Sequence, residues 1–276
     1  MLDQPSELEL ETVHYRRSDD HRIAVITLNR PEVRNAQNRT MTYDLDAAFS
    51  AAAQDDEVRV IVLAGAGPHF SSGHDLKDFR SFEVNPVGPG GRFSGPGAEG
   101  HYAFEDEVYL KMCRRWFDLP KPTIAQVQGR TIAGGLMLMW VCDLIVAADD
   151  ALFADPTLEF GVNGVEWFAH PWELGHRKAK ELLFTGDFLE AQDAERLGMI
   201  NRVVPASELE SATRALAEKI AQKPSFALQL AKLSVNQALD AQGFFSAQQA
   251  AFGLQHVGHS HQRELALRAK LKAARS

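Results

Sequence analysis

The sequence predicts a mixed α/β fold in which a core of strands and helices is followed by a purely helical C-terminal region. Two segments, 60–76 and 122–141, each pass from an apolar strand into a glycine-containing turn and then towards a helix. After Pro205 the apolar residues follow helical spacing only. We therefore expect a core over residues 1–205 and a helical region over residues 206–276.

Composition and charge narrow the function classes. The chain has 276 residues, enough for one large domain, and a formal net charge of −8, which argues against a nucleic-acid partner. It has no apolar run long enough to cross a membrane, and its acidic start does not resemble a secretory signal. Cys113 and Cys142 lie in apolar surroundings and are expected to be buried, reduced thiols, which suits a cytoplasmic protein.

The N-terminal part is predicted to form a hairpin, a helix and a buried strand. Residues 9–16 and 22–28 alternate between apolar and polar side chains on either side of a polar turn, which is typical of a β-hairpin. Asn38 or Thr40 can cap the helix that follows, because both side chains accept hydrogen bonds from a helix N-terminus. The apolar run 58–64 is the next strand.

The rest of the chain alternates between loops, short strands and helices. Residues 84–100 are rich in Gly and Pro and are expected to form a mobile loop before a helix at about 102–117. Short strands are predicted at 122–127, 145–148 and 152–154. The later predictions are helices at 176–184 and 190–197, a strand at 200–204, and helices at 207–222, 225–240 and 244–273.

Two strand ends that open into glycine turns can direct free backbone N–H groups to one point. The segments Val60–Leu76 and Gln128–Gly135 resemble the crotonase (enoyl-CoA hydratase/isomerase) superfamily in this respect, and the order of elements is similar along nearly the whole chain. The resemblance implies a ββα spiral core with C-terminal helices that mediate trimerisation. It also implies an oxyanion hole made by the backbone N–H groups of His74 and Gly134, which would stabilise the enolate of an acyl-CoA thioester.

The resemblance also implies a binding site for CoA. The segment 28–36 is similar to the turn that lies against the pantetheine and the adenosine phosphates, with Arg34 as the phosphate contact and Ala36 as a close backbone neighbour. A plain hairpin exit with a solvated arginine is the alternative. Asp75 can also act as the N-terminal residue of a helix. The residues that line the equivalent groove in relatives are Ser72, His74, Asp75, Leu76 and Lys77.

The acid and base of the hydratases are absent. Those enzymes use two glutamates to position and activate one water molecule, and the equivalent positions are Met137 and Thr157. Neither side chain can exchange protons in that way at neutral pH. The resemblance therefore implies an enolate-forming enzyme that does not use two-glutamate hydration.

Glu166 is the main candidate for a replacement acid or base. It lies one residue past the position at which other members of the superfamily carry a catalytic aspartate, and its apolar and aromatic neighbours would raise its pKa. A solvated loop glutamate or an ion-pair partner is the alternative. His170 can serve catalysis or structure, and Asp155 and Glu159 are the remaining acids nearby.

The histidines of the last helix invite a metal interpretation, but His256, His259 and His261 do not have a clean ligand spacing. We expect them to be exposed or interfacial, with no metal and no cofactor beyond the CoA of the substrate.

The predicted activity is that of an enzyme acting on an acyl-CoA thioester. The alternatives are a double-bond isomerase or a retro-Claisen-type C–C hydrolase that uses Glu166, or a non-catalytic CoA-binding protein. No nucleic acid and no membrane are expected as partners. A homotrimer or hexamer is expected, because the C-terminal helices are rich in large apolar residues. These include Phe226, Leu228, Leu230, Leu233, Phe244, Phe245, Phe252 and Leu254.

Overall fold

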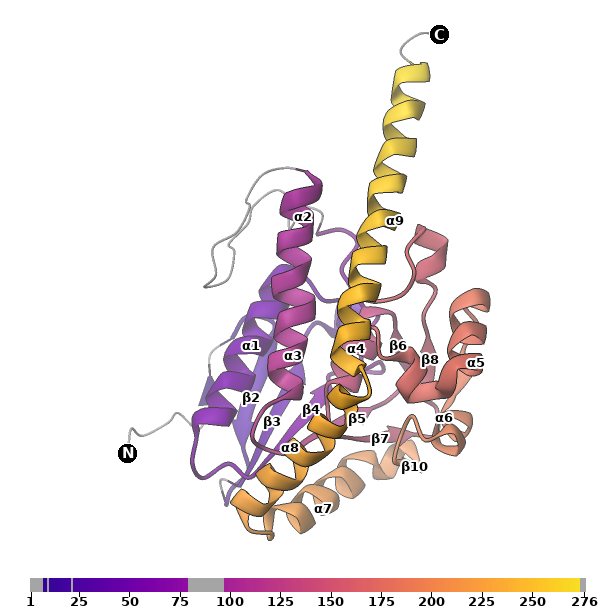
Figure 1. The fold of residues 1–276 in the computed structure, drawn as a ribbon. Helices are drawn as coiled ribbons and strands as arrows, with labels where there is room; N and C mark the ends of the chain where they lie inside the picture. Colours follow the sequence, from indigo (N-terminus) through magenta and orange to yellow (C-terminus); the bar gives the residue numbers. More distant parts are fainter. Residues whose placement is uncertain (1–6, 9, 21, 79–96, 274–276) are drawn as a thin grey trace.

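The computed structural model describes residues 7–8, 10–20, 22–78 and 97–273 (Figure 1). Its main sheet begins with an antiparallel hairpin, and every pairing from β3 onward is parallel. The strand order is β1 (Glu7–Leu8), β2 (Val13–Arg17), β3 (Ile23–Leu28), β4 (Val60–Gly65), β5 (Thr123–Val127), β7 (Leu144–Ala148) and β10 (Arg202–Val204).

A smaller sheet carries the second glycine turn. Its order is β6 (Arg130–Ile132), β8 (Leu152–Ala154) and β9 (Leu189–Glu190). The helices are α1 (Arg39–Gln54), α2 (Ala98–Glu105), α3 (Met112–Phe117), α4 (Gly134–Trp140), α5 (His170–Thr185), α6 (Ala191–Leu197), α7 (Leu209–Ala221), α8 (Ser225–Ala241) and α9 (Phe244–Ala273). A π-helical segment, Asp106–Lys111, joins α2 to α3, and short 3-10 turns lie at Pro31–Val33, Thr157–Phe160 and Ala206–Glu208.

The central strands are apolar on both faces because helices cover both faces of the sheet. In β4, Ile61 and Leu63 belong to the main core, whereas Val60 and Val62 face a second apolar cluster. Helix α7 packs on that second face, against β4, β5 and β7. Because β3, β4, β5 and β7 are parallel, their carboxyl ends lie at one edge of the sheet. The segments that carry the glycine turns come after β4 and β5 at that edge.

Most predicted elements are confirmed. The hairpin forms as β2 and β3, and of the two possible caps it is the Asn38 side chain that accepts a hydrogen bond from Met41 N, at 2.9 Å. Both cysteines are free and buried. The three C-terminal helices are present, and the end of α9 projects away from the rest of the chain (Figure 1). No helix within the described ranges is long and apolar enough to cross a membrane.

One boundary was wrong. The loop expected over 84–100 falls largely outside the described residues, but its last residues, from Ala98, already belong to α2. The helix predicted at 176–184 is confirmed as the second part of α5, after a kink at Gly175, where φ is 70° and ψ is 154°. The first part, which the sequence did not predict, begins at His170, where Pro171 suits the first turn of a helix.

Candidate active site

The two glycine turns lie against each other. Ile132 N donates to Ser71 O at 3.0 Å, which joins the end of β6 to the turn after β4. Gly73 has a φ of +85°, and a Cβ atom there would lie only 2.9 Å from Gly134 N. Only glycine fits this contact, so the sequence at Gly73 permits the close approach of the two backbones.

Two backbone donors at this contact remain free. Gln37 N donates to Gly73 O and Asp75 N donates to Gln37 O, so His74 N points away from this pairing. Gly134 is the first residue of α4, where no earlier turn supplies an acceptor. Within the described part of the chain, neither the His74 N–H nor the Gly134 N–H has an acceptor.

Backbone strain lies at the same place. Ala133, which precedes α4, has φ 47° and ψ −114°, a conformation that L-residues rarely adopt. Such strain costs on the order of 1–3 kcal/mol and is held by the surrounding structure. Here Ala133 N donates to Ala154 O at 2.9 Å in the neighbouring strand. The strained residue directs the first N–H groups of α4 towards the turn at Gly73.

The side chain of His74 also belongs to the site. Its ring lies where a Cβ on Gly134 would be, 2.7 Å from that position, and it stacks on Tyr109 with centroids 4.0 Å apart. Burial lowers the pKa of His74 to about 4, so the ring is neutral at physiological pH. The resemblance required only its backbone, yet the ring forms one wall beside the free N–H groups.

Glu166 is buried next to His74, with 2% of its surface exposed. Gln255 Nε2 donates to Glu166 Oε1 at 2.7 Å, whereas Oε2 lies 3.7 Å from His74 Nε2, beyond hydrogen-bond distance. Burial, followed by the negative charge of Glu105, raises the pKa of Glu166 well above its usual range. The alternative of a solvated loop glutamate is therefore wrong.

The other candidate acids and bases lie elsewhere. Asp155 and His170 are fully buried and contact each other at 2.7 Å, and Asp155 also accepts from Thr157 N at 3.2 Å. Burial alone would raise the pKa of Asp155, but the hydrogen bond and charge of His170 lower it. This pair anchors the start of α5 to the segment after β8. Glu159 is exposed.

The two positions predicted to correspond to the hydratase glutamates are buried and carry no ionisable group. Met137 lies in α4 and is 1% exposed. Thr157 begins the 3-10 turn Thr157–Phe160. Ionisable side chains beside the two glycine turns include those of Glu166, His74 and Tyr109.

The predicted CoA turn and the first glycine turn are joined. Ser72 N donates to Arg34 O at 2.9 Å, and Arg34 is exposed with a left-handed φ of 57°. Ala36 is buried beside them. The guanidinium of Arg34 is therefore placed at the surface, next to the turn that carries His74.

Of the next three predicted residues, Asp75 holds the turn together, whereas Leu76 and Lys77 lie at the surface. Asp75 accepts from Arg30 Nη1 at 2.9 Å and from Lys77 N at 3.0 Å, so it heads a single turn. Asp75 was expected to have a structural role at the N-terminus of a helix, and its side chain does hold a turn within the described range, which ends here at residue 78. Leu76 and Lys77 are exposed on that turn.

Four residues of the site were not recognised from the sequence. Asn35 is fully buried with a φ of 52°, and its amide nitrogen lies within 3.1 Å of Ala66 O, His69 O and Phe70 O, which fixes the glycine turn. Asparagine tolerates this left-handed conformation better than most residues do, and an asparagine in a predicted turn was therefore the only sequence signal for its role. The others gave no local signal and are Gln37, Tyr109 and Gln255.

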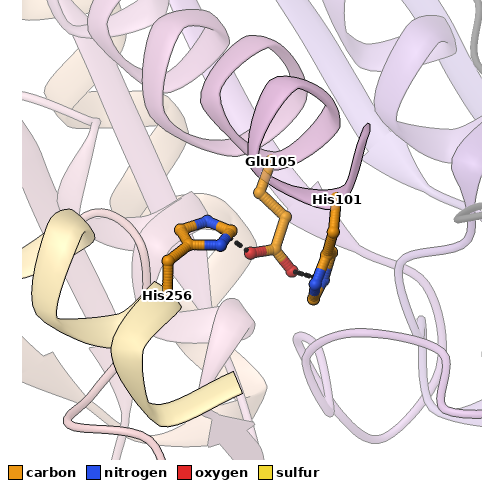
Figure 2. A group of neighbouring side chains, drawn as sticks. All are labelled: His101, Glu105 and His256. Atoms are coloured by element: carbon orange, nitrogen blue, oxygen red, sulfur yellow. Dashed lines mark hydrogen bonds and ion pairs between the residues drawn. The ribbon is translucent and has the colours of Figure 1, made fainter. Parts of the chain in front are cut away.

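Two of the C-terminal histidines are less exposed than expected. His256 and His259 face Glu105 of α2, with Nε2 atoms 3.2 and 3.6 Å from its Oε2 (Figure 2 shows His256). His261 is exposed.

Parallel strands that end in paired glycine turns, with free N–H groups at their meeting point, define a protein of the crotonase superfamily. The family model for enoyl-CoA hydratase/isomerase matches residues 18–272. The chain therefore belongs to the enoyl-CoA hydratase/isomerase family.

Relatives and solved structures support this family assignment. The chain is 47% identical over 261 residues to the "Putative enoyl-CoA hydratase EchA13" of Mycobacterium tuberculosis. The aligned region covers 92% of this chain and 82% of that protein. It is similar to the crystal structure of a probable enoyl-CoA hydratase from Mycobacterium smegmatis, with a TM-score of 0.84, 49% identity, and coverage of 93% of this chain and 98% of the other. A probable enoyl-CoA hydratase from Mycobacterium thermoresistibile gives a TM-score of 0.83 at 49% identity, covering 92% and 99%.

Proposed function

We propose that this protein binds acyl-CoA thioesters and stabilises an enolate with the backbone N–H groups of His74 and Gly134. Family membership supports the class of substrate. Both donors are free, and Gly73 keeps the two backbones in close contact. Fixed donors of this kind stabilise a negative charge as it develops, and losing one typically costs ~10²–10³-fold in turnover.

We propose Glu166 as the acid/base, and the observation that carries this proposal is its free carboxylate oxygen. Oε2 is buried and has no hydrogen-bond partner among the described residues, and it lies 3.7 Å from the ring of His74. Gln255 holds the other oxygen. A carboxyl of raised pKa is a stronger base when ionised and can return a proton near neutral pH.

Double-bond isomerisation is the particular reaction that a single carboxyl favours. Glu166 removes a proton from the α-carbon of a 3-enoyl-CoA, and the electron pair moves onto the thioester oxygen between the two N–H groups. The same carboxylic acid then returns its proton to the γ-carbon, which leaves the 2-enoyl-CoA. Addition of water by the hydratase route would require two carboxyl groups, and the equivalent positions are Met137 and Thr157.

The test is a panel of 2-enoyl-, 3-enoyl- and 3-oxoacyl-CoA substrates, followed by mass spectrometry and ultraviolet absorbance. We expect a 3-enoyl-CoA to change its absorbance at constant mass, and crotonyl-CoA to gain water slowly. Glu166→Gln should abolish the change, whereas Glu159→Gln, a change at an exposed glutamate seven residues away, should not. Release of a free acid and a shortened acyl-CoA would favour C–C cleavage instead. Binding without turnover of any substrate would support the non-catalytic alternative.

We also infer that the chain assembles into a homotrimer or hexamer through its C-terminal helices. Some of the large apolar residues there are buried within the chain, as Phe244 and Phe252 are. Others lie at the surface of α8 and α9, including Phe226, Leu230, Leu233, Val235, Leu254 and Val257. Exposed apolar side chains in this number are typical of an interface. Light scattering at micromolar concentration should give a multiple of three chain masses, and a monomer mass would contradict the assembly.

A further inference from the structure

Four side chains from two helices converge beside the candidate active site. His101 and Glu105 lie one turn apart on α2, and Figure 2 shows both of them facing His256 of α9. His259 lies one turn after His256 on α9. Residues with these spacings share one face of a helix. Ligand atoms of His101, Glu105 and His256 all lie within 4.8 Å of one another. Each helix therefore presents two such side chains to the other.

The hydrogen bonds of this cluster are incomplete. His101 Nε2 lies 2.7 Å from Glu105 Oε1, which accounts for one oxygen of the carboxylate. Within the described ranges, Glu105 Oε2, His256 Nε2 and His259 Nε2 are buried atoms that make no well-aligned hydrogen bond, and they contact one another only as ion pairs, with Oε2 3.2 Å from His256 Nε2 and 3.6 Å from His259 Nε2. The side chain of Glu105 is 4% exposed. Buried polar atoms without a well-aligned hydrogen bond are costly, so a carboxylate oxygen that faces two imidazole nitrogens in this way suits a cation placed between them.

We propose that His101, Glu105, His256 and His259 form a binding site for a divalent transition-metal ion such as Zn²⁺. Two atoms bound to Zn²⁺ at about 2.0–2.1 Å in a tetrahedral arrangement lie roughly 3.3–3.4 Å apart. The distances from Glu105 Oε2 to the Nε2 atoms of His256 and His259 are 3.2 and 3.6 Å. Three imidazoles and one carboxylate are donors that zinc accepts.

His101 must change its hydrogen bonds to become a ligand. Arg263 Nη2 lies 2.7 Å from His101 Nδ1, and because arginine only donates, Nδ1 accepts and the ring proton sits on Nε2. Metal binding at Nε2 moves that proton to Nδ1 and displaces the guanidinium of Arg263. Arg263 is exposed and can rotate into solvent. The arginine therefore competes with the metal for the orientation of His101.

The site would also join the C-terminal helix to the wall of the active site. Tyr109, which stacks on His74, follows Glu105 by one turn, and Gln255, which holds Glu166, directly precedes His256. An ion between α2 and α9 would thus fix both segments. Since an ion that binds only the folded chain stabilises it, saturating Zn²⁺ should raise the melting temperature by on the order of 5 °C.

The test uses the whole protein, stripped with a chelator and titrated with Zn²⁺ alone. We expect one Zn²⁺ per chain by calorimetry and by elemental analysis after gel filtration. Co²⁺ in its place should give the intense visible bands of a tetrahedral site. His256→Ala and Glu105→Gln should each weaken Zn²⁺ binding by ~10²-fold or more, because losing only an outer-shell partner of a ligand already costs ~10–100-fold. His261→Ala, at an exposed histidine on the same helix, is the matched control and should bind as the parent does.

Arg263→Ala distinguishes this site from a simple cluster of histidines. It should bind Zn²⁺ more tightly than the parent, because it removes the competitor for His101, and circular dichroism checks that each variant is folded. A parent protein that takes up no stoichiometric Zn²⁺ would overturn the proposal. So would equal binding by the parent, His256→Ala and Glu105→Gln. None of these measurements depends on turnover of an acyl-CoA, so the proposal fails or stands separately from the proposed activity.

Discussion

The paired glycine turns and the region around the buried Glu166 are built in different ways in this protein. The turns at Gly73 and Gly134 offer backbone N–H groups, and their geometry follows from glycine and from the ends of two strands. The region around Glu166 depends on a side chain whose position and pKa are set by residues far away in the chain. A backbone site can be recognised from a local pattern, whereas a charged side chain acquires its properties from its surroundings.

The largest expected effect on turnover comes from changing the side chain of Glu166. Glu166→Gln keeps the shape and can still accept the hydrogen bond from Gln255, but it removes the proton that is exchanged. We expect turnover to fall by ~10²–10⁴-fold with little change in acyl-CoA affinity. Steady-state kinetics and calorimetry separate the two effects. An unchanged turnover number would assign the acid/base role to another group.

The same variant should be more stable at high pH. The folded-state pKa of Glu166 is raised, so the folded protein loses stability as the pH rises from the unfolded value, about 4.3, through that raised pKa. The glutamine variant does not have this loss. Its melting temperature should therefore exceed that of the parent increasingly as the pH rises, and a constant difference at all pH values would contradict the shift.

The buried pair behind the site should affect stability more than chemistry. Asp155→Asn removes the charge that faces His170, and breaking a buried pair from one side typically costs about 3–5 kcal/mol. Urea unfolding measures this loss. Among molecules that remain folded, turnover should stay close to that of the parent. A fall of the order expected for Glu166→Gln would instead place Asp155 in the chemistry.

A substitution at Gly134 tests the proposed role of the two backbone N–H groups. A Cβ atom there would lie 2.7 Å from the His74 ring, so Gly134→Ala should displace the ring and distort the pair of donors. We expect turnover to fall by ~10²-fold, similar to the loss of one oxyanion donor. Gly253→Ala on α9 is the matched control, because a Cβ atom there meets nothing within 4 Å. Equal activity of both variants would contradict the backbone role.

The smallest effect is expected at the predicted CoA turn. Arg34 is exposed, and a charge-assisted contact with a phosphate contributes about 1.5–3 kcal/mol. Arg34→Ala should raise KM by roughly tenfold to a hundredfold and leave the turnover number nearly unchanged. Short thioesters that lack the adenosine phosphates should show no difference between parent and variant. A variant with unchanged KM would favour the alternative of a solvated arginine.

The sequence by itself determined the order of strands and helices and both glycine turns. These features depend on local sterics and hydrophobic periodicity, which neighbouring residues specify. The tertiary structure decided which acid is buried. Gln255 lies 89 residues from Glu166, and burial, followed by the charge of Glu105 on α2, raises the pKa of Glu166. It also brought His256 and His259 against Glu105, although their spacing alone did not predict a metal site. Desolvation and charge act through space, so no window of sequence contains them.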